Sequence, residues 1–157
     1  MSTFTLVQPR ARRREWELCR GDEVRAVLRL STFRSGAEAE AAGRPLEIEQ
    51  RGWWRPEYVV SDGRTDEAVA RLRRNELELG GRTLTWKRSR FVDEDGEPLV
   101  AVKIRSGFVR SSGEVTVASA VPEQDALVMA LLAMYLILRR NAAAVAGATA
   151  AVTATGA

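Results

Sequence analysis

Along most of the chain, apolar and polar residues alternate in short segments that are separated by turns rich in glycine and aspartate. A period of two places successive side chains on opposite faces of a β-strand. In residues 23–33, for example, the side chains predicted to face inward are those of Val24, Ala26, Leu28 and Leu30. We predict about a dozen short strands, at 3–8, 15–20, 23–33, 45–51, 58–63, 67–73, 75–79, 82–87, 91–96, 99–105 and 113–121, while 37–42 fits either a short helix or an edge strand.

The pattern changes in residues 122–140, where no residue from 126 to 138 is charged. Alanine, leucine and methionine dominate, which favours a helix over a strand. Pro122 suits the first turn, Arg139 and Arg140 suit the last, and Asn141 is expected to stop the helix. Because the helix is apolar around its whole circumference, protein or lipid must surround it. Its apolar run is shorter than the roughly 20 residues of a membrane span, which favours a buried core helix over a tail anchor.

Together, the strands and the enclosed helix predict the fold class. Short strands with glycine turns are typical of an antiparallel sandwich or barrel. About eight strands make a barrel that its own side chains fill, so about twelve leave room for a helix on the axis. We predict a mainly β protein, a closed antiparallel barrel of about twelve strands around a C-terminal apolar central helix. The barrel domain is expected at 1–141, the helix at about 122–140, and a disordered Ala/Thr-rich tail at 142–157.

Three stretches resemble the tubby-like superfamily, which includes tubby C-terminal domains, phospholipid scramblases and LURP-one-related proteins. Residues 58–72 and 91–102 look like its unit of strand, Asp-Gly turn and returning strand, and residues 125–134 look like its terminal helix. The resemblance implies a closed barrel wrapped around a C-terminal apolar helix. Tubby domains bind phosphoinositide headgroups, and scramblases are associated with membranes and calcium. No lipid-binding motif of the family aligns residue by residue with this chain, so no family site is carried over.

Composition excludes several kinds of chemistry. The 157 residues include no histidine and one cysteine, Cys19, so neither a Cys/His zinc site nor a histidine-dependent triad can form. Nucleotide-binding loops and the serine-hydrolase elbow are absent from the sequence. The acidic turn at 93–96 lacks the ligand spacing of an EF-hand. We therefore expect no enzymatic activity, no cofactor and no metal site.

Basic residues are the candidate ligand-binding groups, because a net charge of +3 permits an anionic ligand without requiring one. Strand alternation points some of them outward on neighbouring segments, and arginine's planar fork suits phosphate oxygens. The predicted anion-binding residues are Arg71, Arg73, Lys87, Arg88 and Arg90. The alternative is pairing with nearby carboxylates, namely Glu67, Glu76, Glu78, Asp93 and Glu94.

Two further features have structural and functional interpretations. Trp53 and Trp54 form an aromatic turn, which we interpret as a barrel lid or the edge of the core, with a base-stacking platform as the alternative. The basic cluster at 10–14 is interpreted as a solvated loop, with a phosphate or nucleic-acid contact as the alternative.

Two functional hypotheses follow. One is a non-catalytic binding module that recognises anionic lipid headgroups or phosphates on its outer surface. The other is a protein-interaction or regulatory domain, with nucleic acid as its weaker variant. The expected partner is thus an anionic membrane lipid, a phosphate ligand or another protein, with no transmembrane span. The N-terminus lacks the features of a signal peptide, so we expect a cytoplasmic protein, peripheral at the membrane if its ligand is lipid.

Overall fold

The computed structural model describes residues 1–10, 14–31, 35–106 and 110–155. Within these residues it contains twelve strands followed by one helix, α1, at Glu123–Thr155. The strands are β1 (Ser2–Val7), β2 (Glu15–Arg20), β3 (Glu23–Leu30), β4 (Ala37–Ala41), β5 (Arg44–Arg51), β6 (Glu57–Asp62), β7 (Ala68–Arg73), β8 (Glu76–Leu79), β9 (Arg82–Lys87), β10 (Arg90–Val92), β11 (Pro98–Ser106) and β12 (Ser111–Val117).

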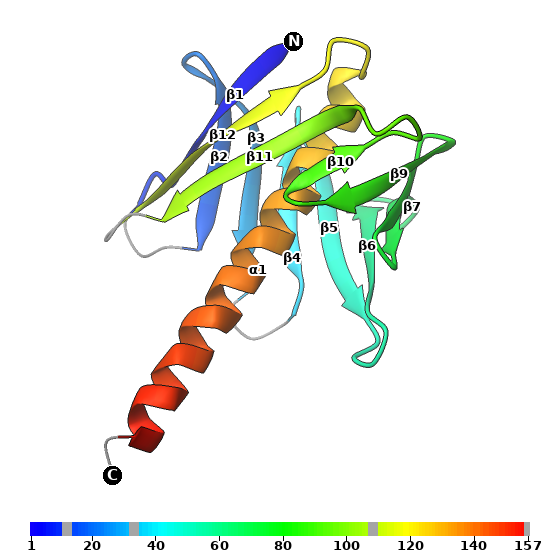
Figure 1. The fold of residues 1–157 in the computed structure, drawn as a ribbon. Coiled ribbons are helices and arrows are strands. Elements are labelled where there is room, and N and C mark those ends of the chain that lie inside the picture. The colour runs from blue at the N-terminus through cyan, green and yellow to red at the C-terminus, as the bar shows by residue number, and fades with distance from the viewer. Residues whose placement is uncertain (11–13, 32–34, 107–109, 156–157) are drawn as a thin grey trace.

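The strands form a closed barrel in which each strand is antiparallel to the next along the chain, and β1 pairs with β12 to close the ring. Closure leaves no unpaired sheet edge. The predicted fold class is confirmed: a mainly β, closed antiparallel barrel surrounds a C-terminal helix (Figure 1).

Several hairpins turn through residues with positive φ, the backbone region that tight hairpin turns require. Gly80 and Gly81 supply it between β8 and β9 at no steric cost. Arg74 and Asn75 adopt it between β7 and β8, and so do Arg88 and Ser89 between β9 and β10. The turns at 80–81, 74–75 and 88–89 therefore each reverse the chain in two residues.

The structure settles one ambiguous segment and corrects one residue. Residues 37–41 form strand β4 with alternating buried alanines and exposed glutamates. Val24 was predicted to face inward, but its side chain is 46% exposed. A bulge between Leu18 and Cys19 shifts the register of β2 against β3, so that Leu18 pairs with Ala26 and Cys19 with Val24. The extra residue on β3 turns Val24 out of the inward alternation.

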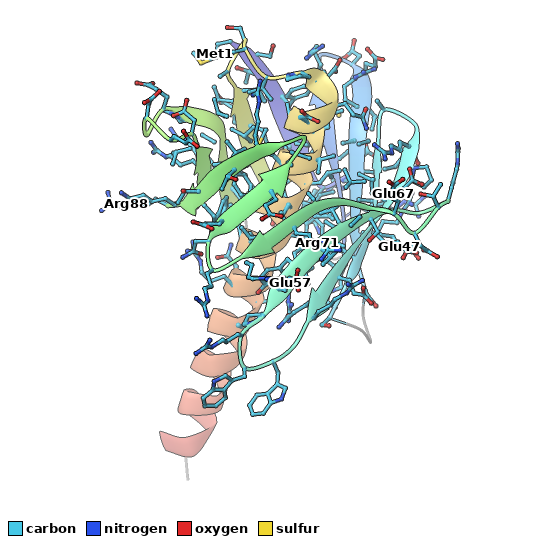
Figure 2. All side chains as sticks on the ribbon, turned by 90° about the vertical axis from the view of Figure 1, so that its right-hand side faces the viewer. Met1, Glu47, Glu57, Glu67, Arg71 and Arg88 are labelled. Atoms are coloured by element: carbon cyan, nitrogen blue, oxygen red, sulfur yellow. The ribbon has the colours of Figure 1, made fainter. Side chains whose placement is uncertain are left out.

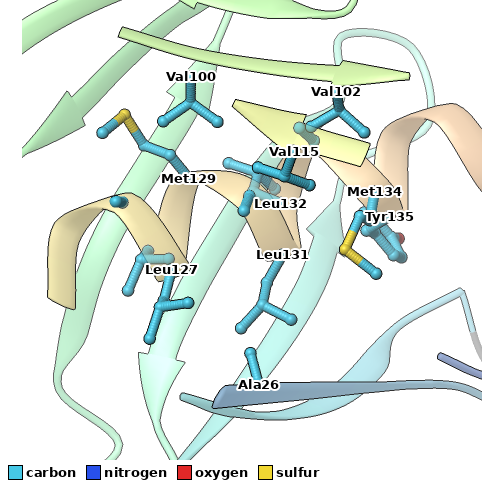
Figure 3. Packing of buried hydrophobic residues seen from close by; sticks show 14 of the residues in the cluster. Ala26, Val100, Val102, Val115, Leu127, Met129, Leu131, Leu132, Met134 and Tyr135 are labelled. Carbon is cyan, nitrogen blue, oxygen red and sulfur yellow. The ribbon is translucent and has the colours of Figure 1, made fainter. Parts of the chain in front are cut away.

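The core of the molecule is the helix inside the barrel, as predicted. Every residue from Ala126 to Leu138 is buried except Leu136, which is partly exposed. Strand residues such as Val100, Val102 and Val115 point toward Leu132 and Met129 on the helix (Figure 3). Apart from Leu136, the apolar side chains of this part of the helix are thus removed from water, which is the main stabilising term in folding.

The predicted helix end at Asn141 is wrong, because α1 continues to Thr155. Asparagine costs a helix less than about 1 kcal/mol, alanine is the best helix former, and an existing helix is easy to extend. Residues 142–155 are mainly alanine with no proline, so their composition favours continuation of the helix in spite of Gly147. Figure 1 shows this part of α1 projecting beyond the barrel. The division into a barrel at 1–141 and a separate tail stays a prediction.

By length and composition, Glu123–Ala143 could cross a membrane, and it is the one such helix among the described residues. However, 67% of its most apolar stretch is buried inside the barrel. Protein therefore already encloses the segment that a bilayer would otherwise have to enclose.

We expect Leu132→Asp to unfold the protein. Leu132 is fully buried, and an unpaired buried carboxylate costs several kcal/mol, against a typical stability of about 5–15 kcal/mol. The matched control is Ala142→Asp, at an exposed position of the same helix. Thermal unfolding followed by circular dichroism should show a cooperative transition for the control only. A cooperative transition in Leu132→Asp near that of the wild type would contradict burial of this face.

Removing residues 144–157 should leave the melting temperature within a few degrees of the wild type. The preceding positions, Ala142 and Ala143, are already exposed, and the projecting helix lies beyond the sleeve (Figure 1). Differential scanning calorimetry of the truncated and full chains measures the effect. A large drop would instead show that the tail contributes to the packing of the barrel.

Candidate functional site

The connections between strands alternate between the two ends of the barrel, because consecutive strands are antiparallel. The helix begins at one end, where Glu123 pairs with Arg25 of β3 at 3.0 Å. It leaves at the other end, where Tyr135 donates a hydrogen bond to the Ser35 carbonyl in the β3–β4 connection. The exit end therefore carries the β1–β2, β3–β4, β5–β6, β7–β8, β9–β10 and β11–β12 connections.

Charge is segregated between these two ends. In the six exit-end connections, none of the described residues is acidic, and the described basic residues are Arg10, Arg14, Arg55, Arg74, Arg88 and Arg110. All six are exposed, and none makes an ion pair with another described residue. We call this set the basic rim.

The opposite end is acidic. Its connections contain Asp22, Asp66, Glu67, Asp93, Glu94, Asp95 and Glu97. All residues of these connections are described, and Arg64 is the one basic residue among them. We call the acidic set the acidic rim. The barrel thus presents opposite charge at its two mouths.

Two tryptophans lie on the β5–β6 connection at the exit end. Trp53 is 85% exposed and Trp54 is 78% exposed, and the two rings meet edge to face at 5.6 Å. The interpretation of this turn as the edge of the core is wrong, because both rings are largely exposed. The chain enters the turn through Gly52 at a φ of 75°, which carries the two rings away from the alternating strand.

The predicted anion-binding residues divide into two groups. Arg71 and Arg73 point outward from β7, and both face Glu57 of β6, at 3.8 Å and 3.0 Å respectively. Cross-strand register also places Glu78 beside Arg71 and Glu76 beside Arg73 on β8. These arginines therefore belong to a ladder of alternating charges. The alternative interpretation, pairing with nearby carboxylates, therefore holds for Arg71 and Arg73. Their partner is Glu57, which was not among the carboxylates predicted for that pairing.

Lys87, Arg88 and Arg90 form the second group, at the tip of the β9–β10 hairpin. All three are exposed, and they have no ion-pair partner within the described parts of the chain. Figure 2 shows Arg88 reaching out to one side, apart from Arg71 and Glu57. The outward glutamates of β8 lie between β7 and β9. The structure therefore does not bring the five predicted residues into one patch, and Arg88 belongs to the basic rim.

The acidic turns have a structural explanation. Asp62 Oδ1 accepts the backbone N–H of Arg64 at 2.8 Å, and its Oδ2 accepts from Arg44 Nε at 2.8 Å. Arg44, together with these backbone donors, lowers the pKa of Asp62. Asp93 likewise accepts the backbone N–H groups of Asp95 and Glu97. Among the described residues, no three His, Cys, Asp or Glu side chains are grouped so that they could hold a metal ion.

The one cysteine is not set up for reactivity. Burial, and secondarily the charge of Glu17, raises the pKa of Cys19. A raised pKa reduces the thiolate fraction, and the thiolate is the nucleophilic form.

A polar collar surrounds the helix where it leaves the barrel. Tyr135, which is fully buried, accepts a hydrogen bond from Arg139 Nη1 at 2.9 Å and donates to the Ser35 carbonyl. Arg139 also donates to Gln50 Oε1 of β5. The Tyr58 ring packs edge to face on Tyr135 at 5.9 Å. The one polar side chain in the apolar run is thus satisfied at the exit.

An open groove of about 1470 Å³ lies beside this exit. Its lining includes apolar residues from three strands and the helix, namely Tyr58, Leu72, Trp86 and Leu136. Arginines of the basic rim and of the β7 ladder border it. The groove opens at the basic end, where Arg55 and Arg74 of the basic rim line it.

Comparisons with protein-family models, with curated proteins and with solved structures find no match to this chain.

Sequence reasoning missed the basic rim and the exposed tryptophans. The sequence does contain the information that predicts the rim. In a meander, every second connection lies at the same end of the barrel, so the charged residues of alternate connections can be assigned to one end or the other. The exposure of Trp53 and Trp54 had no comparable signal, because an aromatic turn can fold inward or outward.

Tyr135→Phe is expected to lower stability at pH 7 by roughly 1 kcal/mol, because Ser35 and Arg139 lose a partner. Burial raises the pKa of Tyr135, although Arg139 opposes the shift. The unfolded state therefore loses the phenol proton first, and wild-type stability falls as pH rises above about 10. Urea unfolding from pH 7 to 11 should show the difference between wild type and variant narrowing at high pH. A constant difference would contradict the raised pKa.

Proposed function

We propose that this protein is a non-catalytic module that binds anionic membrane surfaces through its basic rim. The observation that carries the proposal is the coincidence, at one end of the barrel, of six exposed arginines without ion-pair partners among the described residues and two exposed tryptophans. Basic residues near an anionic membrane contribute about 1 kcal/mol each. Tryptophan is enriched where protein meets the headgroup layer, because its ring is apolar and its N–H is polar.

The position of the helix also supports membrane binding at this end of the barrel. It leaves the barrel at the same end, and residues 141–155 carry no charged side chain. Figure 1 shows this part of α1 directed away from the barrel, on the side where the β5–β6 connection turns. An anionic surface that met the basic rim would therefore also meet an uncharged helix. The acidic rim would face away from the membrane and would orient the molecule.

The charge ladder on β5–β8 supports the rim over the outer wall as the contact surface. Arg71 and Arg73 are neutralised locally by Glu57, and Glu76 and Glu78 lie beside them. Exposed pairs of this kind add little to stability, but their carboxylates repel anionic headgroups. The resemblance to the tubby-like superfamily, with its lipid-binding members, stays a proposal of the same kind.

Vesicle co-sedimentation at low and physiological salt tests the proposal. The wild type should bind phosphatidylcholine vesicles only when they contain phosphatidylserine, and salt should weaken binding. Arg55→Glu/Arg74→Glu/Arg88→Glu should bind roughly 100-fold more weakly, and Trp53→Ser/Trp54→Ser should also bind more weakly.

The matched control is Arg64→Glu/Arg82→Glu/Lys103→Glu, which changes net charge equally at exposed positions outside the basic rim. It should retain nearly all of the binding. Equal loss in the control would show a response to net charge alone. Absence of wild-type binding at low salt would favour the protein-interaction alternative.

A further inference from the structure

The barrel does not enclose the helix evenly. Helix α1 packs most extensively against β11, β3 and β4. On the other side, β8 and β10 are the shortest strands, with 4 and 3 residues. Leu136 is the one residue between Ala126 and Leu138 that stays partly exposed. The groove beside the helix exit is where this sleeve is incomplete.

The floor of the groove is apolar and partly open to solvent. Leu136 of the helix, Trp86 of β9 and Tyr58 of β6 are each partly exposed, and Leu72 of β7, which also lines the groove, is buried. Trp86 is held in place by the Phe91 ring, at 4.8 Å. Exposed aromatic and aliphatic surface of this kind favours an apolar occupant.

The border of the groove is charged, with arginine in excess. Five arginines (Arg51, Arg55, Arg71, Arg73 and Arg74) and three glutamates (Glu57, Glu76 and Glu78) line it. Glu57 already accepts from Arg71 and Arg73. Arg55 and Arg74 are exposed and make no ion pair with any described residue. Two guanidinium groups are therefore available to an anion at the mouth.

We propose that the groove binds a single-chain anionic amphiphile, a long-chain carboxylate or phosphate. Its acyl chain lies along the floor against Leu136 and Trp86, and its headgroup is held by Arg55 and Arg74. The chain replaces water on the uncovered side of the helix. The planar guanidinium forks match the two oxygens of a carboxylate or phosphate.

The border also argues against other anions. Three glutamates among the arginines would repel a polyanion such as nucleic acid, which needs a continuous basic track. A short phosphate ligand would leave the apolar floor open to water. A single small anionic headgroup attached to an apolar chain is the chemistry that satisfies both the floor and the border.

This inference deepens the proposed function, on which it rests for the source of the ligand. The β5–β6 connection carries the exposed tryptophans, and its Gly52 and Arg55 line the groove. A membrane that touched the rim would thus lie next to the mouth of the groove. The two ideas can still fail separately, because the amphiphile can be offered in solution without any bilayer.

Isothermal titration calorimetry below the micelle concentration provides the test, with decanoate, dodecanoate, dodecyl phosphate and dodecanol as probes. Each buried methylene should tighten binding about fourfold, so dodecanoate should bind roughly 15-fold more tightly than decanoate. Dodecanoate and dodecyl phosphate should both bind, and their relative affinities show whether the site prefers a carboxylate or a phosphate. Dodecanol, which has no charge, should bind at least tenfold more weakly than dodecanoate. Equal affinity for dodecanoate and dodecanol, or no dependence on chain length, would overturn the proposal.

Two variants locate the site. Leu136→Glu places a like charge on the floor and should weaken dodecanoate binding at least tenfold, with folding checked by its melting temperature. Arg55→Ala/Arg74→Ala changes exposed positions only and should bring dodecanoate affinity close to that of dodecanol. The matched control, Arg64→Ala/Arg82→Ala, should bind like the wild type. If Leu136→Glu does not fold, the Arg55→Ala/Arg74→Ala variant tests the site by itself. Unchanged dodecanoate binding by that variant would contradict the proposal. Vesicle binding without dodecanoate binding would leave the rim function standing and remove the groove.

Discussion

An α-helix that is apolar on every side is stable in water only when something encloses it, and this requirement organises the whole protein. Residues 126–138 form such a helix, and the barrel supplies the sleeve. The ends of the sleeve are fixed by polar contacts. Arg20 and Arg25 reach Glu123 where the helix starts. Where the helix leaves, the Tyr135 hydroxyl donates to the Ser35 carbonyl and accepts from Arg139, which also donates to Gln50. The register of the helix is thereby set at both mouths.

The meander topology then determines where the charged residues of the connections lie in space. Alternate connections lie at the same end, so basic residues in every second connection gather at one mouth and acidic residues at the other. At the entry end, Glu123 and Asp125 in the first turn of α1 complement the positive end of the helix dipole. The helix continues past the basic rim to Thr155, and its last turn carries no basic residue. The dipole therefore favours the acidic side chains at the entry end only.

Local sequence patterns were enough to predict the strands, the closed barrel and the buried helix, because alternation and all-round apolarity are properties of single segments. Features that depend on pairing were not predictable in the same way. Val24 is turned outward by a bulge that only the register of β2 on β3 reveals. Arg71 and Arg73 pair with Glu57, which is distant in sequence and adjacent only through the β6–β7 register. Asn141 does not end the helix, because a single weak helix former has less effect than the alanines that follow it.

Native-state hydrogen exchange, resolved by residue, tests the central claim most directly. If the helix is the enclosed core, the amides of residues 127–137 should exchange only through global unfolding. The amides of residues 144–155, on the same helix beyond the barrel, should exchange much faster. Exchange of residues 127–137 at the rate of residues 144–155, with the strands still protected, would show that the barrel does not depend on the helix it surrounds.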